Sequence, residues 1–445
     1  SSEHFHRRLQ RTTSQRCRSL ESLGETIGLE AGMSIQTSLP VIGLAPNAKG
    51  PLHGLRVVDL SRLVAGNMLT LQLADFGADV IKIEPPKVGD ALRKWRLLKD
   101  GTSVWWQVQS RNKRSLSLDL KQAEAQEIVR TLIKEADVLI ENFRPGTLEG
   151  WGLDPEKLLE INPRLIVLRI SGYGQTGPYR DKPGFGVVAE AMGGLRHLTA
   201  EPGRVPVRVG ISIGDTLASL HGVIGILLAL QERHNSGKGQ IIDIALYEAV
   251  FNCMESLLPE YSAFGEVRQA AGSALPGIAP TNAYQCADGG YVLVAGNGDS
   301  IFKRLMTVIG RDDLGNDPQL ENNDGRVKRV VELDQAIGEW AKTLSTTKAL
   351  EVLDAVAVPA GRIYTVADIA SDPHYKAREN IQTIQMKDGS KVDVPGVIPK
   401  LSRTPGSIKT LAPDIGQNTD EVLKSIGLTD DQVASLKERG IAFTK

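Results

Sequence analysis

The sequence of 445 residues is too long for one ordinary domain and predicts two or three. With 41% hydrophobic and 24% charged residues and a net charge of −1, it is typical of a globular protein and gives no overall electrostatic argument for binding nucleic acid or an anionic membrane. The three cysteines, Cys17, Cys253 and Cys286, lie far apart, so they predict neither a disulfide framework nor a metal cluster and fit a reducing compartment.

Residues 1–45 differ in composition from the rest of the chain and are predicted to be an N-terminal extension. Its opening stretch contains serines, threonines and one acid, Glu3, and its arginines are Arg7, Arg8, Arg11, Arg16 and Arg18. This composition resembles a mitochondrial transit peptide and would place the protein in the mitochondrial matrix. The alternative is an ordinary arm on a cytoplasmic protein, because three glutamates follow soon after. No secretory hydrophobic region and no apolar run of membrane-spanning length is expected in the chain.

The first predicted elements form a β-α-β unit. Residues 56–60 predict a strand, 65–76 a helix that ends at Gly77, and 79–84 a second strand. This order favours a parallel sheet. A dinucleotide-binding domain is the obvious alternative, but the turn at residues 61–67 has one glycine where the Gly-x-Gly-x-x-Gly pattern needs three, which argues against nicotinamide binding.

Further alternation of strands and helices extends this unit into a Rossmann-like α/β domain. Strands are predicted at residues 115–118, 138–140, 165–170 and 240–246, and helices at 122–135 and from Tyr247 onward. In such a doubly wound sheet, ligands bind beyond the carboxyl ends of the strands. The turn after residue 60 and the loops after residues 140 and 170 all lie at such ends.

The predicted domains are a large α/β domain over residues 46–250 and a smaller α+β domain over residues 270–370. A Gly/Pro-rich connection, residues 272–280, separates them. A hairpin is expected in the smaller domain, from strands 283–286 and 291–294. Residues 371–445 are predicted to return to the large domain.

One stretch combines a chemically useful residue with a helix start. Residues 208–213 read as a short strand, and the apolar spacing after Asp215 predicts a helix that ends at the glycine-rich residues 235–239. Asp215 is thus expected on or beside the N-cap. One interpretation is a simple cap, since Asp is favoured there. The other is a nucleophilic carboxylate, which Gly214 would let a substrate approach and the helix N-terminus would keep ionised.

The residues around Asp215 resemble a known family. The sequence Gly-Ile-Ser-Ile-Gly-Asp-Thr-Leu-Ala-Ser-Leu-His-Gly at 210–222 is similar to the nucleophile segment of the class III CoA-transferases, the group that includes formyl-CoA transferase and succinyl-CoA:glutarate CoA-transferase. The resemblance extends from about Leu52 to the C-terminus. It implies an interlocked homodimer, in which each chain is threaded through a ring made by the other.

Several loops carry the same resemblance and imply contacts with coenzyme A. They are Gly-Asp-Ala-Leu-Arg-Lys-Trp at 89–95, Asn-Lys-Arg-Ser at 112–115, Glu-Asn-Phe-Arg-Pro-Gly at 141–146 and Gly-Gln-Asn-Thr-Asp-Glu-Val-Leu at 416–423. The implied CoA-binding residues are Val64, Ala65, Arg111, Lys113, Leu118, Lys121, Asn142, Phe143, Arg144 and Tyr173. Cationic side chains suit the phosphates of CoA. Without the resemblance, the basic run after residue 110 would be read as a solvated surface and Phe143 as core.

The implied activity moves CoA from an acyl-CoA, expected to be succinyl-CoA, to a dicarboxylic acid through an aspartyl-CoA thioester on Asp215. Coenzyme A is then a substrate, and neither a tightly bound cofactor nor a metal is expected. Arg62 and Arg93, together with Arg208, are the candidates for binding a second carboxylate. No nucleic-acid or membrane partner is expected.

Two other functions are compatible with the resemblance. The first is α-methylacyl-CoA racemase chemistry, which needs an acid and a base on opposite faces of the substrate. The racemase branch has a histidine followed by an aspartate where this sequence has Phe185 and Gly186, so this alternative is disfavoured. The second is a catalytically silent CoA-binding protein, against which the intact Gly214-Asp215 pair argues.

Overall fold

The computed structural model describes residues 39–445, so the predicted transit peptide lies almost wholly outside the described residues. The described chain divides into two units. The smaller contains Gln382–Asp393 and the described residues up to Ile42; Val41 forms a parallel bridge to Thr383. The larger contains Gly43–Ile381 and Val394–Lys445. The domain boundaries given above stay predictions.

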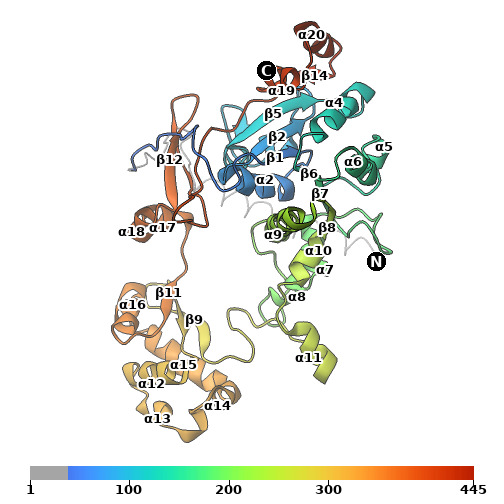
Figure 1. Ribbon diagram of the computed structural model, residues 1–445. Coiled ribbons are helices and arrows are strands. Elements are labelled where there is room, and N and C mark those ends of the chain that lie inside the picture. Colours follow the sequence, from blue (N-terminus) through green and yellow to red (C-terminus); the bar gives the residue numbers. More distant parts are fainter. Residues whose placement is uncertain (1–38) are drawn as a thin grey trace, which may run out of the picture. The chain divides into compact units, whose positions relative to one another are not determined.

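A seven-stranded sheet organises the larger unit (Figure 1). Its order is β14-β5-β2-β1-β6-β7-β8, from β14 (Ala442–Phe443), β5 (Lys113–Leu118), β2 (Asp79–Glu84), β1 (Arg56–Asp59), β6 (Val138–Glu141), β7 (Ile166–Ser171) and β8 (Ile241–Ala245). All neighbours pair in parallel except β14, which runs antiparallel to β5. The predicted parallel sheet is confirmed. The chain winds outward from β1 to β5, then crosses back to β6, so the topological switch point lies between β1 and β6.

Helices cover both faces of this sheet, and alternate strand residues reach opposite faces. Val57 packs with α2 (Ala65–Asp75) and α9 (Ile213–Ser236), whereas its neighbour Val58 packs with α4 (Ala123–Ile133) and α19 (Thr419–Ser425). Both valines are fully buried. Full burial of one such side chain contributes roughly 1.5–3 kcal/mol, so two apolar layers hold the strand ends in place.

The remaining elements of the larger unit fall into two groups. The first group precedes β9 (Thr281–Gln285) or follows β13 (Lys391–Pro395) in the chain: η1 (Ala91–Lys94), β3 (Leu98–Lys99), β4 (Thr102–Ser103), α3 (Val104–Gln109), α5 (Thr147–Gly150), α6 (Pro155–Ile161), α7 (Gly186–Met192), α8 (Leu195–Leu198), α10 (Leu246–Phe251), α11 (Leu257–Phe264) and α20 (Asp430–Glu438). The other group is α12 (Asp299–Val308), α13 (Asp312–Gly315), η2 (Pro318–Leu320), α14 (Asn323–Lys328), α15 (Val330–Ala341), α16 (Thr346–Ala355), α17 (Val366–Ser371) and α18 (Pro373–Ala377).

A second, three-stranded antiparallel sheet has its own apolar core. It orders β11 (Ala360–Arg362), β10 (Tyr291–Ala295) and β9 (Thr281–Gln285), and β9 and β10 form the predicted hairpin. Val292 and Val294 face Phe302 and Leu333 from the surrounding helices. A further pair of strands, β12 (Ile381–Gln385) and β13 (Lys391–Pro395), forms a sheet of its own.

Helix α9 confirms one prediction and corrects two. It ends at Ser236 with Gly237 in the left-handed conformation, as the glycine-rich signal predicts. Residues 208–213 form no strand, because the described chain offers them no pairing partner. The helix is also long and apolar enough for a membrane span by length and composition, contrary to expectation. Core helices of globular proteins meet the same criterion, and α9 packs against α2, α7 and α10.

Candidate active site

A cavity of about 640 Å³ opens at the switch point, where the carboxyl ends of β1, β6 and β7 meet the start of α9. The turn after β1, the loop after β6 and the loop after β7 line it, as the doubly wound topology predicts. The sequence-predicted residues among its walls are Arg62, Val64, Ala65, Asn142, Phe143, Arg144, Arg208 and Asp215. One cavity therefore collects residues from three separate segments of the chain.

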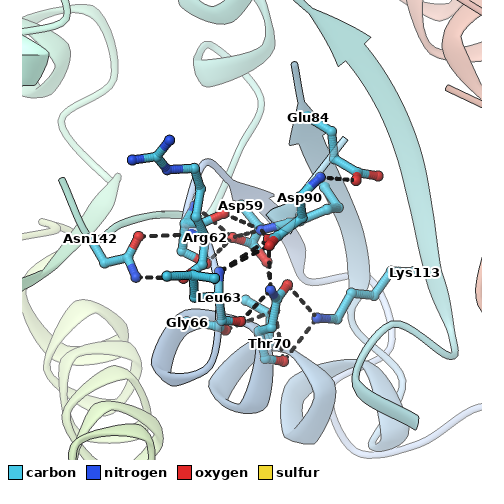
Figure 2. Close-up of polar contacts among 12 residues, drawn as sticks. Asp59, Arg62, Leu63, Gly66, Thr70, Glu84, Asp90, Lys113 and Asn142 are labelled. Carbon is cyan, nitrogen blue, oxygen red and sulfur yellow. Dashed lines mark hydrogen bonds and ion pairs between the residues drawn. The ribbon is translucent and has the colours of Figure 1, made fainter. Parts of the chain in front are cut away.

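Arg62 and Asn142 connect the two loops across the switch point. The Asn142 side-chain oxygen accepts a hydrogen bond from the Arg62 backbone N–H at 2.7 Å, and its amide nitrogen donates to the Arg62 carbonyl oxygen, also at 2.7 Å (Figure 2). Both hydrogen-bonding atoms of the Asn142 amide are thus used on backbone. This pair of hydrogen bonds, called the clasp below, uses only the backbone of Arg62, so the guanidinium takes no part in it.

The turn after β1 is held in a conformation that its sequence alone would not favour. Leu63 has a φ of 62°, in the left-handed region, where a branched side chain costs roughly 1–2 kcal/mol. Two hydrogen bonds offset that cost: the Leu63 N–H donates to Asp90 at 3.1 Å, and the Leu63 carbonyl accepts from the Asn67 side chain at 2.6 Å. Asp90 is 1% exposed, so the turn is anchored to the protein interior.

A buried charged network that includes Asp59 and Asp90 holds the same turn (Figure 2). The Lys82 ammonium lies 3.4 Å from Asp59 and 3.4 Å from Asp90, and it donates to the Ser61 carbonyl. Asp59 also accepts hydrogen bonds from the hydroxyls of Ser61 and Thr70, each at 2.6 Å. Because both carboxylates and the ammonium are buried, this network is stable only while every member keeps its partners.

Several predicted CoA-binding residues do not line the cavity. Leu118 lies in the apolar core and Lys121 is exposed elsewhere, while Lys113 is buried and donates to the Asn67 carbonyl at 2.8 Å. Burial lowers the pKa of Lys113 to about 7. Arg111 forms a two-bond ion pair with Asp75, at 3.1 and 2.7 Å. These side chains brace the fold around the site.

Two more predicted residues also have partners outside the cavity wall. The Arg93 guanidinium donates to both carboxylate oxygens of Glu84, at 2.8 and 2.7 Å, and lies 4.1 Å from the ring of Trp106. Tyr173 packs against Tyr179 and Tyr247, with ring centroids 5.9 and 6.3 Å apart.

Aromatic rings, most of them not predicted, form two faces of the cavity. Phe143 packs edge-on against Trp151 at 5.0 Å, with the Arg62 guanidinium 5.4 Å from its ring. Trp95 and Trp105 form a second pair at 6.3 Å, with Arg96 over Trp105 at 5.2 Å. Trp95 ends the motif at residues 89–95, so the sequence did contain a signal for it. Such faces suit a flat, partly charged ligand group.

Asp215 lies in the first turn of α9, as its third residue, and not at the N-cap, which is Ser212. Burial is the main cause that raises the pKa of its carboxyl group from about 3.8 to about 6; nearby Glu190 raises it further, and Arg208 opposes both. Asp215 is therefore ionised at neutral pH, as expected, but its surroundings raise its pKa instead of lowering it. Desolvation and a like charge outweigh the helix dipole here.

Glu190 and Arg208 were not predicted as neighbours of Asp215. Glu190, on α7, is 1% exposed; its Oε1 accepts from Arg208 at 3.3 Å, and its Oε2 has no hydrogen-bond partner among residues 39–445. Glu190 is the one acid in the apolar segment Gly186–Met192, which is a weak sequence signal. The arrangement places Asp215 and Arg208 on the cavity wall, with the carboxylate of Glu190 buried behind them.

This site offers nucleophilic and electrostatic chemistry. The carboxyl group of Asp215 has a pKa near 6, so it is ionised at neutral pH yet more basic than an ordinary aspartate. In residues 39–445, no group of three or more His, Cys, Asp or Glu side chains is placed to hold a metal ion.

Comparison with known proteins gives consistent matches over nearly the whole chain. Residues 52–419 match CoA-transferase family III. The chain is 44% identical over 393 residues to the succinyl-CoA–D-citramalate CoA-transferase of Chloroflexus aurantiacus, covering 88% of this chain and 98% of that protein. It is 35% identical over 390 residues to the succinate–glutarate CoA-transferase of Agrobacterium fabrum, covering 86% and 97%. A CaiB/BaiF family protein from Brucella suis has a similar solved structure, with a TM-score of 0.75, 36% identity and coverage of 85% and 100%.

Proposed function

Since the chain belongs to CoA-transferase family III and is an enzyme of this type, we propose that it transfers CoA from succinyl-CoA to a dicarboxylic acid. Two relatives support this donor and this class of acceptor, because one is named for succinyl-CoA and D-citramalate and the other for succinate and glutarate. The observation that carries the mechanism is the position of Asp215, a carboxylate of raised pKa on the wall of the switch-point cavity.

In this proposal Asp215 is the nucleophile. One of its oxygens attacks the thioester carbon, the C–S bond breaks, and CoA leaves as a thiolate from a mixed anhydride. The thiolate attacks the carbonyl carbon of Asp215, which releases succinate and forms an aspartyl-CoA thioester. The acceptor carboxylate then attacks this thioester, and the two reverse steps restore the carboxylate of Asp215 and form the new acyl-CoA.

The cavity walls supply contacts that suit CoA. Phe143 provides an apolar face for the adenine, Arg144 is an exposed cation for a phosphate, and Val64 and Ala65 bring backbone close to the pantetheine arm. Asn142 acts through the clasp on Arg62, because both ends of its amide are already bonded. Arg93 is held by Glu84 outside the cavity wall, whereas Arg62 and Arg208, the other two candidates for binding substrate, both line the cavity.

We also propose that the chain acts as a homodimer. Helix α9 leaves Ile224 and Leu228 52% and 66% exposed, and α11 leaves Phe264 84% exposed. Ile224 and Leu228 lie one turn apart on α9, and exposed apolar side chains grouped in this way are typical of surfaces that a partner covers. Sedimentation at micromolar concentration tests this, and a monomer would contradict it.

Racemase chemistry remains the second candidate, and the cavity argues against it. Phe185 lines the cavity at the position where the racemases have a histidine, and a phenyl ring cannot carry a proton. We expect no deuterium at the α-carbon of a 2-methylacyl-CoA held with the enzyme in heavy water. Exchange that Asp215→Ala abolishes would overturn the transferase mechanism.

The proposed reaction is tested by isotope exchange and trapping. Labelled succinate should enter succinyl-CoA in the wild type, and hydroxylamine should trap an acyl group at residue 215. Asp215→Asn should lose both signals and keep CoA binding. An active Asn variant would make Asp215 a structural residue. A wild type that binds CoA but exchanges no carboxylate from a broad panel would favour a silent CoA-binding protein.

A further inference from the structure

The cationic side chains of the cavity differ in the groups that they already contact. Arg62 lies over Phe143, Arg96 over Trp105, and Lys182 over Tyr179 at 3.5 Å, so all three face aromatic rings. Three further cations line the cavity and have no ring partner among the described residues, namely Arg144, Arg180 and Arg208. Of these, Arg208 is the one whose charge acts on the carboxyl group of Asp215.

Arg208 is anchored from behind by Glu190. The Glu190 side chain is 1% exposed and the Arg208 side chain 45% exposed, and their contact is 3.3 Å. A buried carboxylate is costly without a partner, so Glu190 favours positions of Arg208 that keep the guanidinium beside it. One N–H of Arg208 is used in this contact, and a guanidinium has five. Its other donors are available on the open side of the cavity.

We propose that Arg208 binds the non-reacting carboxylate of the dicarboxylic substrate, and that Glu190 is a positioning residue that holds Arg208 beside Asp215. This inference rests on the proposed function and deepens it. A guanidinium binds a carboxylate through two parallel hydrogen bonds. A monocarboxylic acid cannot form them with Arg208, because its one carboxylate is the reacting group. The same contact would serve the free carboxylate of the succinyl donor, because donor and acceptor occupy the site in turn.

The charges around Asp215 make the proposal testable by pH. Helix α9 packs against α2, α7, α10, β7 and β8. Glu190 from α7 and Arg208 are the charged groups that act on Asp215. Charged side chains of the other packed elements are engaged elsewhere: Asp75 with Arg111, Glu248 with the Ala245 N–H, Arg169 with Glu141, and Asp243 with the Gln175 N–H.

The first experiment compares acceptors of equal length with and without a second carboxylate, for example glutarate and pentanoate, with succinyl-CoA as donor. In Arg208→Gln, kcat/KM for glutarate should fall roughly 10- to 100-fold, the size of a lost charge-assisted hydrogen bond, and kcat/KM for pentanoate should change little. The donor loses the same contact in both assays, so the ratio of the two acceptors is the readout. Arg96→Gln is the matched control and should leave that ratio unchanged.

The second experiment follows the acid limb of the kcat/KM profile for succinyl-CoA. Glu190→Gln keeps the shape of the side chain and removes its charge, so the limb should move to lower pH. Arg208→Gln removes the opposing charge, so the limb should move to higher pH. A general structural defect would not shift the two variants in opposite directions.

The outcomes separate this inference from the proposed function. An unchanged ratio of glutarate to pentanoate in Arg208→Gln overturns the role of Arg208, and acid limbs that move together or not at all overturn the role of Glu190. Because the ratio is measured on one preparation, partial misfolding cancels from it. If hydroxylamine traps nothing at residue 215 of the wild type, the proposed mechanism fails instead.

Discussion

Gly186 lies directly against the carboxylate of Asp215. A Cβ atom built on Gly186 would stand 2.4 Å from Oδ2 of Asp215, closer than any van der Waals contact allows. The first residue of α7 therefore has no room for a side chain, and the nucleophile candidate is positioned by a glycine from a different helix. The shape of the site therefore depends on the absence of a Cβ methyl group at residue 186.

Gly186→Ala should consequently reduce kcat strongly while leaving CoA affinity almost unchanged. The added methyl group must displace the carboxylate of Asp215 from its position, and a shift of about 1 Å can cost roughly 100-fold in rate. Steady-state kinetics with calorimetric titration of CoA checks this. Gly361→Ala, on β11, adds a methyl group where nothing lies within 4 Å of it and serves as a control for general loss of fold. Full activity in Gly186→Ala would show that the carboxylate does not need this position.

Asp215→Asn should stabilise the protein at pH 8. The folded-state pKa of Asp215 is raised from about 3.8 to about 6, so its ionised form is disfavoured in the fold. That destabilisation is fully present above about pH 6 and absent below about pH 3.8, and it corresponds to roughly 1–3 kcal/mol. Thermal unfolding of both proteins from pH 4 to pH 8 measures it. A stability difference that is constant across this range would contradict the raised pKa.

Asn142→Ala and Arg62→Ala should have distinct effects. Asn142→Ala breaks the clasp between the loops after β1 and β6, so the affinity for CoA should fall about tenfold or more, as expected for two lost hydrogen bonds. Arg62→Ala keeps the clasp, which uses only the backbone of Arg62. It should therefore leave the loops in place and affect only contacts of the guanidinium. Hydrogen exchange of the Arg62 amide reads out the clasp directly, and equal protection in both variants would argue against it.

Arg169 should be essential for stability because it pairs with the buried carboxylate of Glu141. Its Nε donates to Glu141 at 2.7 Å, and burial still raises the pKa of Glu141 to about 7. Arg169→Met should cost about 3–5 kcal/mol at pH 8, and less at pH 5, where Glu141 can take up a proton. Urea unfolding at both pH values checks this. Glu149→Gln, which removes the more exposed partner of Arg169, should cost less than 1 kcal/mol.

Arg111 and Arg144 should separate stability from CoA binding. Arg111 is 3% exposed and paired with Asp75, so Arg111→Ala leaves a buried carboxylate and should cost about 3 kcal/mol. Arg144 is exposed on the cavity wall, so Arg144→Ala should weaken CoA binding severalfold with the thermal midpoint unchanged. If Arg111→Ala instead weakened CoA binding without a loss of stability, Arg111 would have the CoA-binding role that the basic motif implied.

The sheet could be predicted from the sequence because its strands are buried on both faces. The strands Val138–Glu141 and Ile166–Ser171 each begin with three consecutive apolar residues, and turn residues bound them clearly. The alternation in residues 205–211 looks equally strand-like, yet Val205 is 81% exposed and Ile211 55%. Strand propensity there has no neighbouring strand to pair with, and a single sequence does not reveal that.

The electrostatic details of the site could not be predicted in the same way. Arg111 and Lys113 read as free cations, but their partners, Asp75 and Asn67, come from a helix more than thirty residues earlier. Likewise, Glu190 acts on Asp215 across the packing of α7 against α9. Such pairings depend on tertiary distance, whereas motif and periodicity report only local structure.

The edge strand β14 determines when the fold can be completed during synthesis. Ala442 and Phe443 cover the outer edge of β5, whose residues Ser117 and Leu118 they pair with. A ribosome makes β5 more than three hundred residues before β14, so the growing chain carries an open sheet edge until residues 442 and 443 have emerged. Open edges invite pairing with other chains. The nascent protein is therefore exposed to aggregation at this edge throughout the synthesis of the residues between β5 and β14.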